Sequence, residues 1–263
     1  MSARIPVVFV SHGAPDALLN APDAVACWQQ IGQQVPRPKA ILVVSAHWEA
    51  RRPTASLSGA PPTLHDFAGF APALQRLYYP APGAPLLAER AVALMSNAGI
   101  AADLHPSRGL DHGAWAPLTA MYPQANVPVT QLSLVQHADA AYHVSLGQAL
   151  APLRDEGVLI LASGAITHNF AWMTSDGQAP LPQAQQFNDW VAQRLSTHDV
   201  PGLLAYRTGS LGHEAHPTEE HFLPLFVALG AAHGDPVMRY QPHFTHGNFS
   251  MDAYVWGGAT HPA

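Results

Sequence analysis

The sequence predicts a single α/β domain, a three-layer sandwich in which helices cover both faces of a mainly parallel or mixed sheet. Two observations predict this class. Short, continuously apolar segments, typical of central strands buried on both faces, alternate along the chain with segments of helical periodicity. In addition, no linker or change in composition divides residues 1–263, a length that suits one large α/β domain.

Strands are expected where apolar and β-branched residues run together. The expected strands are Val7–Ser11, Ile41–Ala46, Val127–Leu134 and Val158–Ser163, with a further candidate at Gly99–Leu104. The segment "GNFSMDAYVWGG" (residues 247–258) predicts a last strand near the C-terminus.

Helices are expected between these strands, because apolar residues there recur at helical spacing. The expected helices are Asp23–Ile31, Ala84–Ala98, Asp139–Leu153, Gln183–Leu195 and Glu219–Leu229, with an apolar helix after Gly113. Residues 50–83 are instead rich in proline, glycine and aromatic residues, which predicts a long loop. Long ordered loops in compact domains are usually functional, so we expect this one to form part of the wall of a binding cavity.

The composition excludes several classes of protein. Hydrophobic residues make up 48% of the chain and charged residues 11%, which argues against disorder. The net charge is −6 and the 12 lysines and arginines are scattered, so no nucleic-acid partner is expected. No apolar stretch reaches the roughly 18–20 residues of a membrane span, so no membrane partner is expected. The single cysteine, Cys27, and the lack of a signal-peptide layout predict a cytoplasmic protein, either a monomer or a homodimer.

Histidine stands out, with 16 residues, and it is the commonest metal ligand in proteins. His12 follows the first expected strand, and His47 follows the second. Ligands in open α/β sheets bind at the carboxyl ends of strands, where both histidines are expected. Each alone is equally well explained as a core histidine bonded to backbone. Their matched placement favours a pair of metal ligands.

Further candidates lie at other element ends. His168 follows the strand Val158–Ser163 after a turn containing glycine. Glu220 and His221 are expected in the first turn of the last long helix, where the helix dipole disfavours a cation but suits a carboxylate or a neutral histidine. Two histidines plus one further histidine or glutamate is the general plan of a catalytic metal site.

The remaining histidines give less direct signals. His112 lies between two glycines and follows Asp111, which is also explained as a turn in which Asp111 caps a helix. His65 lies in the aromatic loop and is either a pocket residue or polar surface. Most others, His246 among them, have no supporting pattern and are expected on the surface or in packing. The sequence has no GxSxG, P-loop or GxGxxG motif, and Cys27 has no nearby catalytic partner.

Eight segments, in this order, resemble one known family. They are "SHGAPDALL", "VVSAHWE", "PPTLHDFAGF", "YYPAPG", "GLDHGAWAPL", "PVTQLSL", "ASGAITHNF" and "HPTEEHFLPL". Together they resemble the DOPA-dioxygenase branch of the class III extradiol ring-cleavage dioxygenases, the LigB superfamily, from about residue 6 to residue 256. The resemblance implies an oxidoreductase that opens the ring of a catechol, DOPA-like or a related catecholic acid, and incorporates both atoms of O2.

The resemblance also implies a mononuclear non-haem metal centre, usually Fe(II), although some members contain Zn(II). His12, His47 and His221 match the metal-binding histidines. In the protocatechuate branch the third ligand is a glutamate, so Glu220 beside His221 leaves the third ligand open. His168 matches an active-site histidine that is either a ligand or the acid/base, and His112 matches a histidine that contacts substrate.

The expected substrate-binding residues are Trp48, His65 and Tyr79, in an aromatic wall shared with Phe67, Phe70, Tyr78 and Trp115. The candidates for a substrate carboxylate are Arg51, Arg52 and Arg108. The particular catechol and the choice between 2,3- and 4,5-cleavage stay open. Two other functions compete with ring cleavage: a zinc-dependent hydrolase or amidase that uses the same histidines, and a non-catalytic relative that binds proteins.

Overall fold

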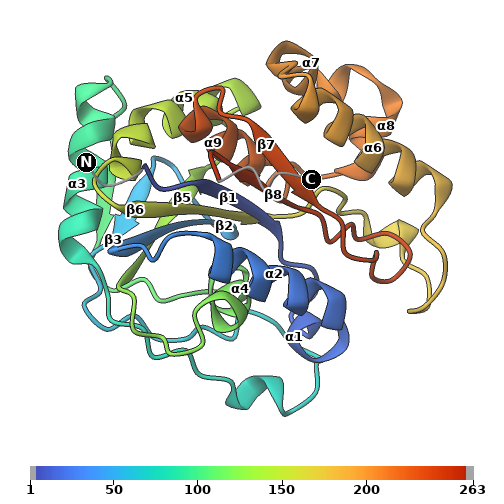
Figure 1. Cartoon of the computed structure of the whole chain (residues 1–263), viewed down its shortest axis with the longest axis horizontal. Helices are drawn as coiled ribbons and strands as arrows, with labels where there is room; N and C mark the ends of the chain where they lie inside the picture. Colours follow the sequence, from blue (N-terminus) through green and yellow to red (C-terminus); the bar gives the residue numbers. More distant parts are fainter. Residues whose placement is uncertain (1–3, 259–263) are drawn as a thin grey trace.

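The continuously apolar segments form the centre of an eight-stranded sheet, with strand order β4-β3-β5-β2-β6-β1-β8-β7 (Figure 1). The computed structural model describes residues 4–258. Its strands are β1 (Val7–Ser11), β2 (Ala40–Ala50), β3 (Thr54–Ser56), β4 (Asp103–His105), β5 (Val129–Val135), β6 (Val158–Gly164), β7 (Val237–Tyr240) and β8 (Ala253–Trp256).

Helices connect most of these strands. The α-helices are α1 (Ala17–Asn20), α2 (Pro22–Gln34), α3 (Pro85–Asn97), α4 (His112–Met121), α5 (Ala140–Leu150), α6 (Pro182–Ser196), α7 (Val200–Leu204), α8 (Ser210–Ala215) and α9 (Leu223–Ala232). Four short 3-10 helices are η1 (Leu74–Arg76), η2 (Ala151–Arg154), η3 (Phe170–Trp172) and η4 (Tyr206–Thr208).

The four central strands β5, β2, β6 and β1 are parallel to one another, and antiparallel pairs occur at both sides. Helices α1, α2 and α4 cover one face of the sheet, and α5 and α9 cover the other (Figure 1). Each face has its own buried apolar cluster. The predicted α/β sandwich with a mixed sheet is therefore confirmed, and the carboxyl ends of the parallel strands meet at one edge of it.

The structure corrects four details of the predicted elements. Strand β2 continues past Ala46 to Ala50, because a bulge between Val44 and Glu49 shifts its register with β5 and lets pairing resume. Strands β3 and β7 were not predicted, and the candidate strand at Gly99–Leu104 is reduced to β4, which spans Asp103–His105. Helix α9 begins at Leu223, not at Glu219. Pro224 therefore lies in its first turn, where the missing N–H costs little.

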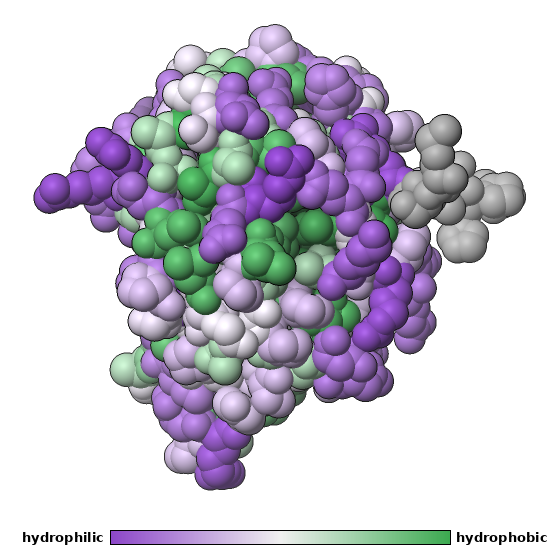
Figure 2. Space-filling model, turned by 90° about the vertical axis from the view of Figure 1, so that its left-hand side faces the viewer, coloured by the Kyte–Doolittle hydropathy of each residue, from purple (hydrophilic) through white to green (hydrophobic). Residues whose placement is uncertain are grey.

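The surface seen from the side of α3 mixes hydrophilic and apolar side chains, with the apolar ones gathered near its middle (Figure 2). The exposed large apolar residues of the described chain include Leu86 of α3 and Leu104 of β4. None of the helices between residues 4 and 258 has the length and apolar character needed to cross a lipid bilayer.

Candidate metal centre and active site

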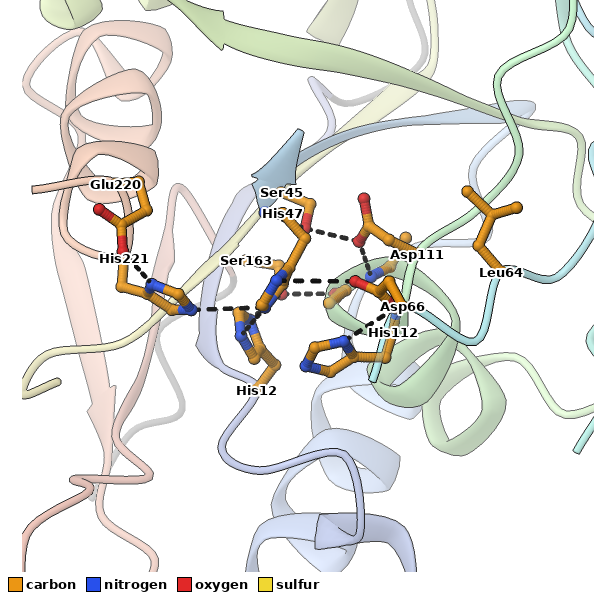
Figure 3. A network of polar contacts seen from close by, with 12 residues as sticks. His12, Ser45, His47, Leu64, Asp66, Asp111, His112, Ser163, Glu220 and His221 are labelled. Atoms are coloured by element: carbon orange, nitrogen blue, oxygen red, sulfur yellow. Dashed lines mark hydrogen bonds and ion pairs between the residues drawn. The ribbon is translucent and has the colours of Figure 1, made fainter. Parts of the chain in front are cut away.

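Three histidines from distant parts of the chain bring their Nε2 atoms together (Figure 3). His12 directly follows β1, His47 lies within β2, and His221 lies two residues before the start of α9. Nε2 of His47 lies 3.0 Å from Nε2 of His12 and 3.3 Å from Nε2 of His221. The structure thus brings together the three residues predicted as metal ligands.

The spacing of these nitrogens fits one metal ion. With metal–nitrogen distances of about 2.0–2.1 Å, two histidine nitrogens on one ion lie about 3.0 Å apart at a right angle and about 3.4 Å apart at a tetrahedral angle. The distances of 3.0 and 3.3 Å lie at these values. Three ligands on one side of an ion also leave positions open for a substrate.

Ser163, at the end of β6, fixes the ring of His12. The Ser163 hydroxyl donates to the carbonyl oxygen of Gly113 at 2.5 Å and lies 2.9 Å from Nδ1 of His12. Because its proton is already used, this hydroxyl accepts the Nδ1–H of His12. The lone pair of His12 is therefore on Nε2, toward the other two histidines.

Helix α4 approaches His12 and His47 closely at Gly113. A Cβ atom at Gly113 would lie 2.4 Å from Oγ of Ser45 and 3.2 Å from both Nδ1 of His12 and Cδ2 of His47. A side chain here would displace the histidines, so glycine permits the close contact between α4 and the two strands.

Glu220 fixes the ring of His221. Oε1 of Glu220 lies 3.0 Å from Nδ1 of His221 and also accepts from the Thr218 hydroxyl at 2.9 Å. The Nδ1–H of His221 therefore points to Glu220, and its Nε2 points to the other two histidines. Contrary to the predicted placement in the first turn of the last helix, Glu220 and His221 lie in the turn that precedes α9.

The backbone of His221 is held against β6. Its carbonyl accepts from the N–H of Ala165 at 2.8 Å, and a Cβ atom at Gly164 would lie 2.2 Å from that carbonyl oxygen. Gly164 is therefore required for the last turn before α9 to reach the end of β6. This contact places His221 beside the residues that follow β1 and β6.

His47 is supported by a buried polar network behind it (Figure 3). The backbone N–H of His47 donates to the Ser45 hydroxyl at 3.2 Å, and that hydroxyl donates to Asp111 at 2.7 Å. Asp111 is fully buried, and it also accepts from Gln131 and, as the N-cap of α4, from the backbone N–H of Ala114. The sequence-based alternative that Asp111 caps a helix is thus confirmed. Because its partners are satisfied, this network holds the bulged segment of β2 in one conformation.

Asp66 links His112 to His47. Oδ1 of Asp66 accepts from both the backbone N–H and Nδ1 of His112 at 3.0 Å, and Oδ2 lies 3.6 Å from Nδ1 of His47. Burial raises the pKa of Asp66, but the hydrogen bonds from His112 outweigh it and bring the pKa to about 2. The ionised Asp66 therefore directs Nε2 of His112 away from itself, and His112 lines the cavity. Asp66 lies in the quoted segment "PPTLHDFAGF", in which the sequence pointed to His65 and not to the aspartate beside it.

His168 packs flat against His221. The two rings are nearly parallel, 8° apart, with centroids 3.5 Å from each other. The possible ligand atoms of His168, Glu220 and His221 lie within 4.8 Å of one another. His168 is not part of the corresponding group formed by His12, His47 and His221. Its ring therefore lies beside the three converging nitrogens and faces the same cavity.

Burial keeps these imidazoles neutral. It lowers the pKa of His47 and of His168 to about 4, with neighbouring histidines adding to the effect and nearby carboxylates opposing it. Burial also lowers the pKa values of His12 and His221 well below the ordinary value, and the surrounding histidines lower them further. Neutral imidazoles offer the lone pairs that metal binding and proton acceptance require.

A cavity of about 360 Å³ opens over the three histidines. Its wall contains Gly13, Ala14, Pro15, Asp16, Phe70, Ala165, Phe170, Met173, His246 and Phe249, besides the histidines already described. Phe70 belongs to the 50–83 segment, which was expected to form part of the wall. His246 and Phe249 were missed, because nothing in their sequence surroundings indicates that the chain returns to the site after β7.

The predicted substrate-binding residues are not part of this wall. The Tyr79 hydroxyl donates to the carbonyl of Tyr122 inside the core, so its ring serves packing. Nε2 of His65 lies 3.0 Å from the carbonyl oxygen of Leu77, which closes the aromatic loop on itself. Trp48 points away from His47, because successive side chains of a strand alternate, and it packs against Arg108.

Comparisons with known proteins agree with this geometry. Residues 6–256 match the family described as the catalytic LigB subunit of aromatic ring-opening dioxygenase. The 4,5-DOPA dioxygenase extradiol of Escherichia coli (strain K12) is 41% identical over 240 residues, 89% of this chain and 87% of that protein. The protein of that name from Beta vulgaris is 43% identical over 233 residues, 85% of each chain. A crystal structure of an uncharacterized protein from Escherichia coli K12 superposes with a TM-score of 0.82 at 36% identity and covers 97% of this chain and 100% of that one.

Proposed function

The chain belongs to the LigB family of aromatic ring-opening dioxygenases, and we propose that it cleaves a DOPA-like catechol at one metal ion held by His12, His47 and His221. Extradiol ring opening with O2, an oxidoreductase activity, is common to the family and to the named relatives. What we propose beyond that activity is the ligand set, the metal, the role of each nearby histidine and the substrate.

One observation carries the assignment of the ligands. The Nδ1 atoms of His12 and His221 are occupied by Ser163 and Glu220, so the lone pairs on their Nε2 atoms converge with Nε2 of His47. Lone pairs this close repel each other unless a cation lies between them. Glu220 has its Oε1 engaged with Nδ1 of His221, which supports His221 rather than Glu220 as the third ligand.

We propose Fe(II) as the metal in the cell, and Zn(II) as an ion that the same histidines would also accept. The bound ion would supply positive charge that acidifies the catechol hydroxyls and a position at which O2 and the catechol ring are held together. A zinc hydrolase would use the same three histidines, but the relatives matched over most of the chain are named dioxygenases.

We assign proton transfer to His112 and His168, the two histidines beside the ligands. Nδ1 of His112 donates to Asp66, so its Nε2 is the free acceptor for a catechol proton. His168, stacked on His221, lines the same cavity, where it would hold a proton and return it to the opened product. Phe70, Phe170 and Phe249 would exclude water from the ring.

We propose 4,5-cleavage of a DOPA-like catechol, since several relatives are named 4,5-DOPA dioxygenase extradiol. We also propose a cytoplasmic location, in keeping with the single cysteine, and a monomer or homodimer. Sedimentation at several protein concentrations would decide between these two states.

The test is O2 consumption by the protein after anaerobic loading with Fe(II), with DOPA as the substrate. We expect O2 uptake in equal amount to DOPA and a yellow ring-opened semialdehyde, whose mass and fragmentation identify the cleaved bond. No uptake with Fe(II), together with ester or amide hydrolysis by the Zn(II)-loaded protein, would contradict the proposal. A matched His105→Ala variant, which alters an exposed histidine outside the cavity, serves as the control for the histidine substitutions below.

A further inference from the structure

The cavity over the three histidines carries an unbalanced set of charges. Its wall contains one carboxylate, Asp16, and no arginine or lysine. All 12 arginines and lysines of the chain fall within residues 4–258, which the structure describes, so none of them lines the cavity. A substrate carboxylate at this wall therefore meets no arginine or lysine side chain.

The arginines that the sequence offered for a substrate carboxylate are engaged or remote. Arg108 donates to the carbonyl of His47 at 3.1 Å and to Asp111 at 3.3 Å, with its guanidinium over the ring of Trp48. It therefore lies behind the ligands, on the side away from the cavity. Arg51 and Arg52 are exposed and do not line the cavity.

Apart from Asp16 and the five histidines already described, the ionisable residue in the cavity wall is His246. It provides no net positive charge. Its Nδ1 lies 3.2 Å from Oδ1 of Asp176, and its backbone N–H donates to the same oxygen at 2.9 Å. His246 is therefore already paired with a carboxylate, so it offers a substrate anion no unpaired cationic group.

Asp16 is held in place by the turn that follows His12. The backbone carbonyl of Asp16 accepts from the N–H groups of Leu19 and Asn20, and its Oδ2 accepts from the side-chain amide of Asn20 at 2.8 Å. Within residues 4–258, no arginine, lysine or histidine forms an ion pair with Asp16. Oδ1 of Asp16 is therefore left to bind a ligand. Asp16 lies four residues after His12, one of the proposed metal ligands.

We propose that Asp16 binds an ammonium group on the substrate's side chain, so that the enzyme selects cationic and zwitterionic catechols over anionic ones. This inference depends on the proposed function, because it assumes that the catechol ring lies over the three histidines. Phe70, Phe170 and Phe249 provide apolar contacts for the ring and its methylene groups. A DOPA-like substrate is then recognised by its ammonium group, and its carboxylate adds nothing to the binding.

The test compares three catechols with two-carbon substituents: dopamine, which is cationic, neutral 4-ethylcatechol, and anionic 3,4-dihydroxyphenylacetate. Their Kd values are measured by calorimetry under argon with the Fe(II)-loaded protein, and kcat/KM in air. We expect dopamine to bind about tenfold more tightly than 4-ethylcatechol, in keeping with one charged hydrogen bond, and the anion to bind most weakly.

The variant Asp16→Asn keeps the size of the side chain and removes its charge. We expect it to reduce the ratio of the dopamine and 4-ethylcatechol affinities about tenfold, to near one. This ratio cancels any general damage to the site, since both ligands use the same histidines. Asp23→Asn is the matched control, because Asp23 is exposed on α2, where it pairs with His243 and does not line the cavity.

An unchanged affinity ratio in Asp16→Asn, or tightest binding of the anion by the unaltered protein, would overturn the inference. Lack of turnover with DOPA as well as with all three catechols would instead contradict the proposed function. In that case the Kd values still decide the role of Asp16, because they need no reaction.

Discussion

Nδ1 of His221 lies 3.0 Å from Oε1 of Glu220, and this contact separates the roles of two neighbouring residues that both suit a metal site. The carboxylate orients the ring, and the ring presents Nε2 to His12 and His47. Partners of this kind typically change metal affinity by about 10- to 100-fold when they are removed.

The first prediction follows from this contact. His221→Ala should abolish stoichiometric binding of Fe(II), whereas Glu220→Gln, which keeps an oxygen that can accept from Nδ1, should weaken binding by at most about tenfold. Metal content after anaerobic loading and gel filtration, measured by plasma emission, checks both. If Glu220→Gln loses the metal while His221→Ala retains it, then Glu220 is the third ligand.

A second prediction concerns the hydroxyl that orients His12. Ser163→Ala removes the acceptor for Nδ1–H of His12 and leaves the Gly113 carbonyl without its donor. We expect a roughly 10- to 100-fold loss of metal affinity, measured by competition with a chelator. Ser11→Ala is the matched control, because the Ser11 hydroxyl is also buried beside His12 but has no hydrogen-bond partner within the described residues. Equal losses in the two variants would mean that general packing, not orientation of His12, is responsible.

A third prediction separates ligand from acid/base at His168. His168 stacks on His221, but it does not belong to the group of converging nitrogens formed by His12, His47 and His221. His168→Ala should therefore retain most of the Fe(II) and lose about 10²- to 10⁴-fold in kcat, the usual contribution of a positioned proton-transfer group. Metal content and kcat are measured on one preparation. A variant without metal would identify His168 as a ligand.

The sequence predicted the convergence of His12, His47 and His221 better than the lining of the cavity, for a physical reason. His12 follows a continuously apolar run, and such runs form the central parallel strands whose carboxyl ends converge. This rule placed His12 correctly. His47 lies within β2, and a bulge that no local pattern indicates turns it into the site.

The wall depends instead on how distant segments pack. Trp48, His65 and Tyr79 lie close in sequence to motif residues, yet Tyr79 is buried in the core and His65 bonds to its own loop. Phe249 reaches the cavity from the segment between β7 and β8, far along the chain from most of the other wall residues. No periodicity in the sequence encodes such long-range contacts, so they were not predictable.

The last prediction concerns stability and a histidine outside the metal site. The side chain of His216 is fully buried, with Nε2 lying 2.8 Å from the carbonyl oxygen of Ile166 and its ring stacked on Phe222. Burial lowers the pKa of His216 to about 3, although the hydrogen bond to Ile166 acts in the opposite direction. Below about pH 6.5 the unfolded chain therefore binds a proton at this residue that the folded protein does not.

The free energy of unfolding contributed by His216 should therefore decrease as the pH falls from about 6.5 toward 3, by about 2 kcal/mol between pH 7 and pH 5. His216→Gln can still donate to Ile166 but does not titrate, so it isolates this effect from the other buried histidines. Its deficit in unfolding free energy relative to the unaltered protein, measured by urea denaturation, should shrink by about 2 kcal/mol between pH 7 and pH 5. A deficit that stays constant over this range would mean that His216 titrates alike in the folded and unfolded chains, and that its burial does not contribute to acid unfolding.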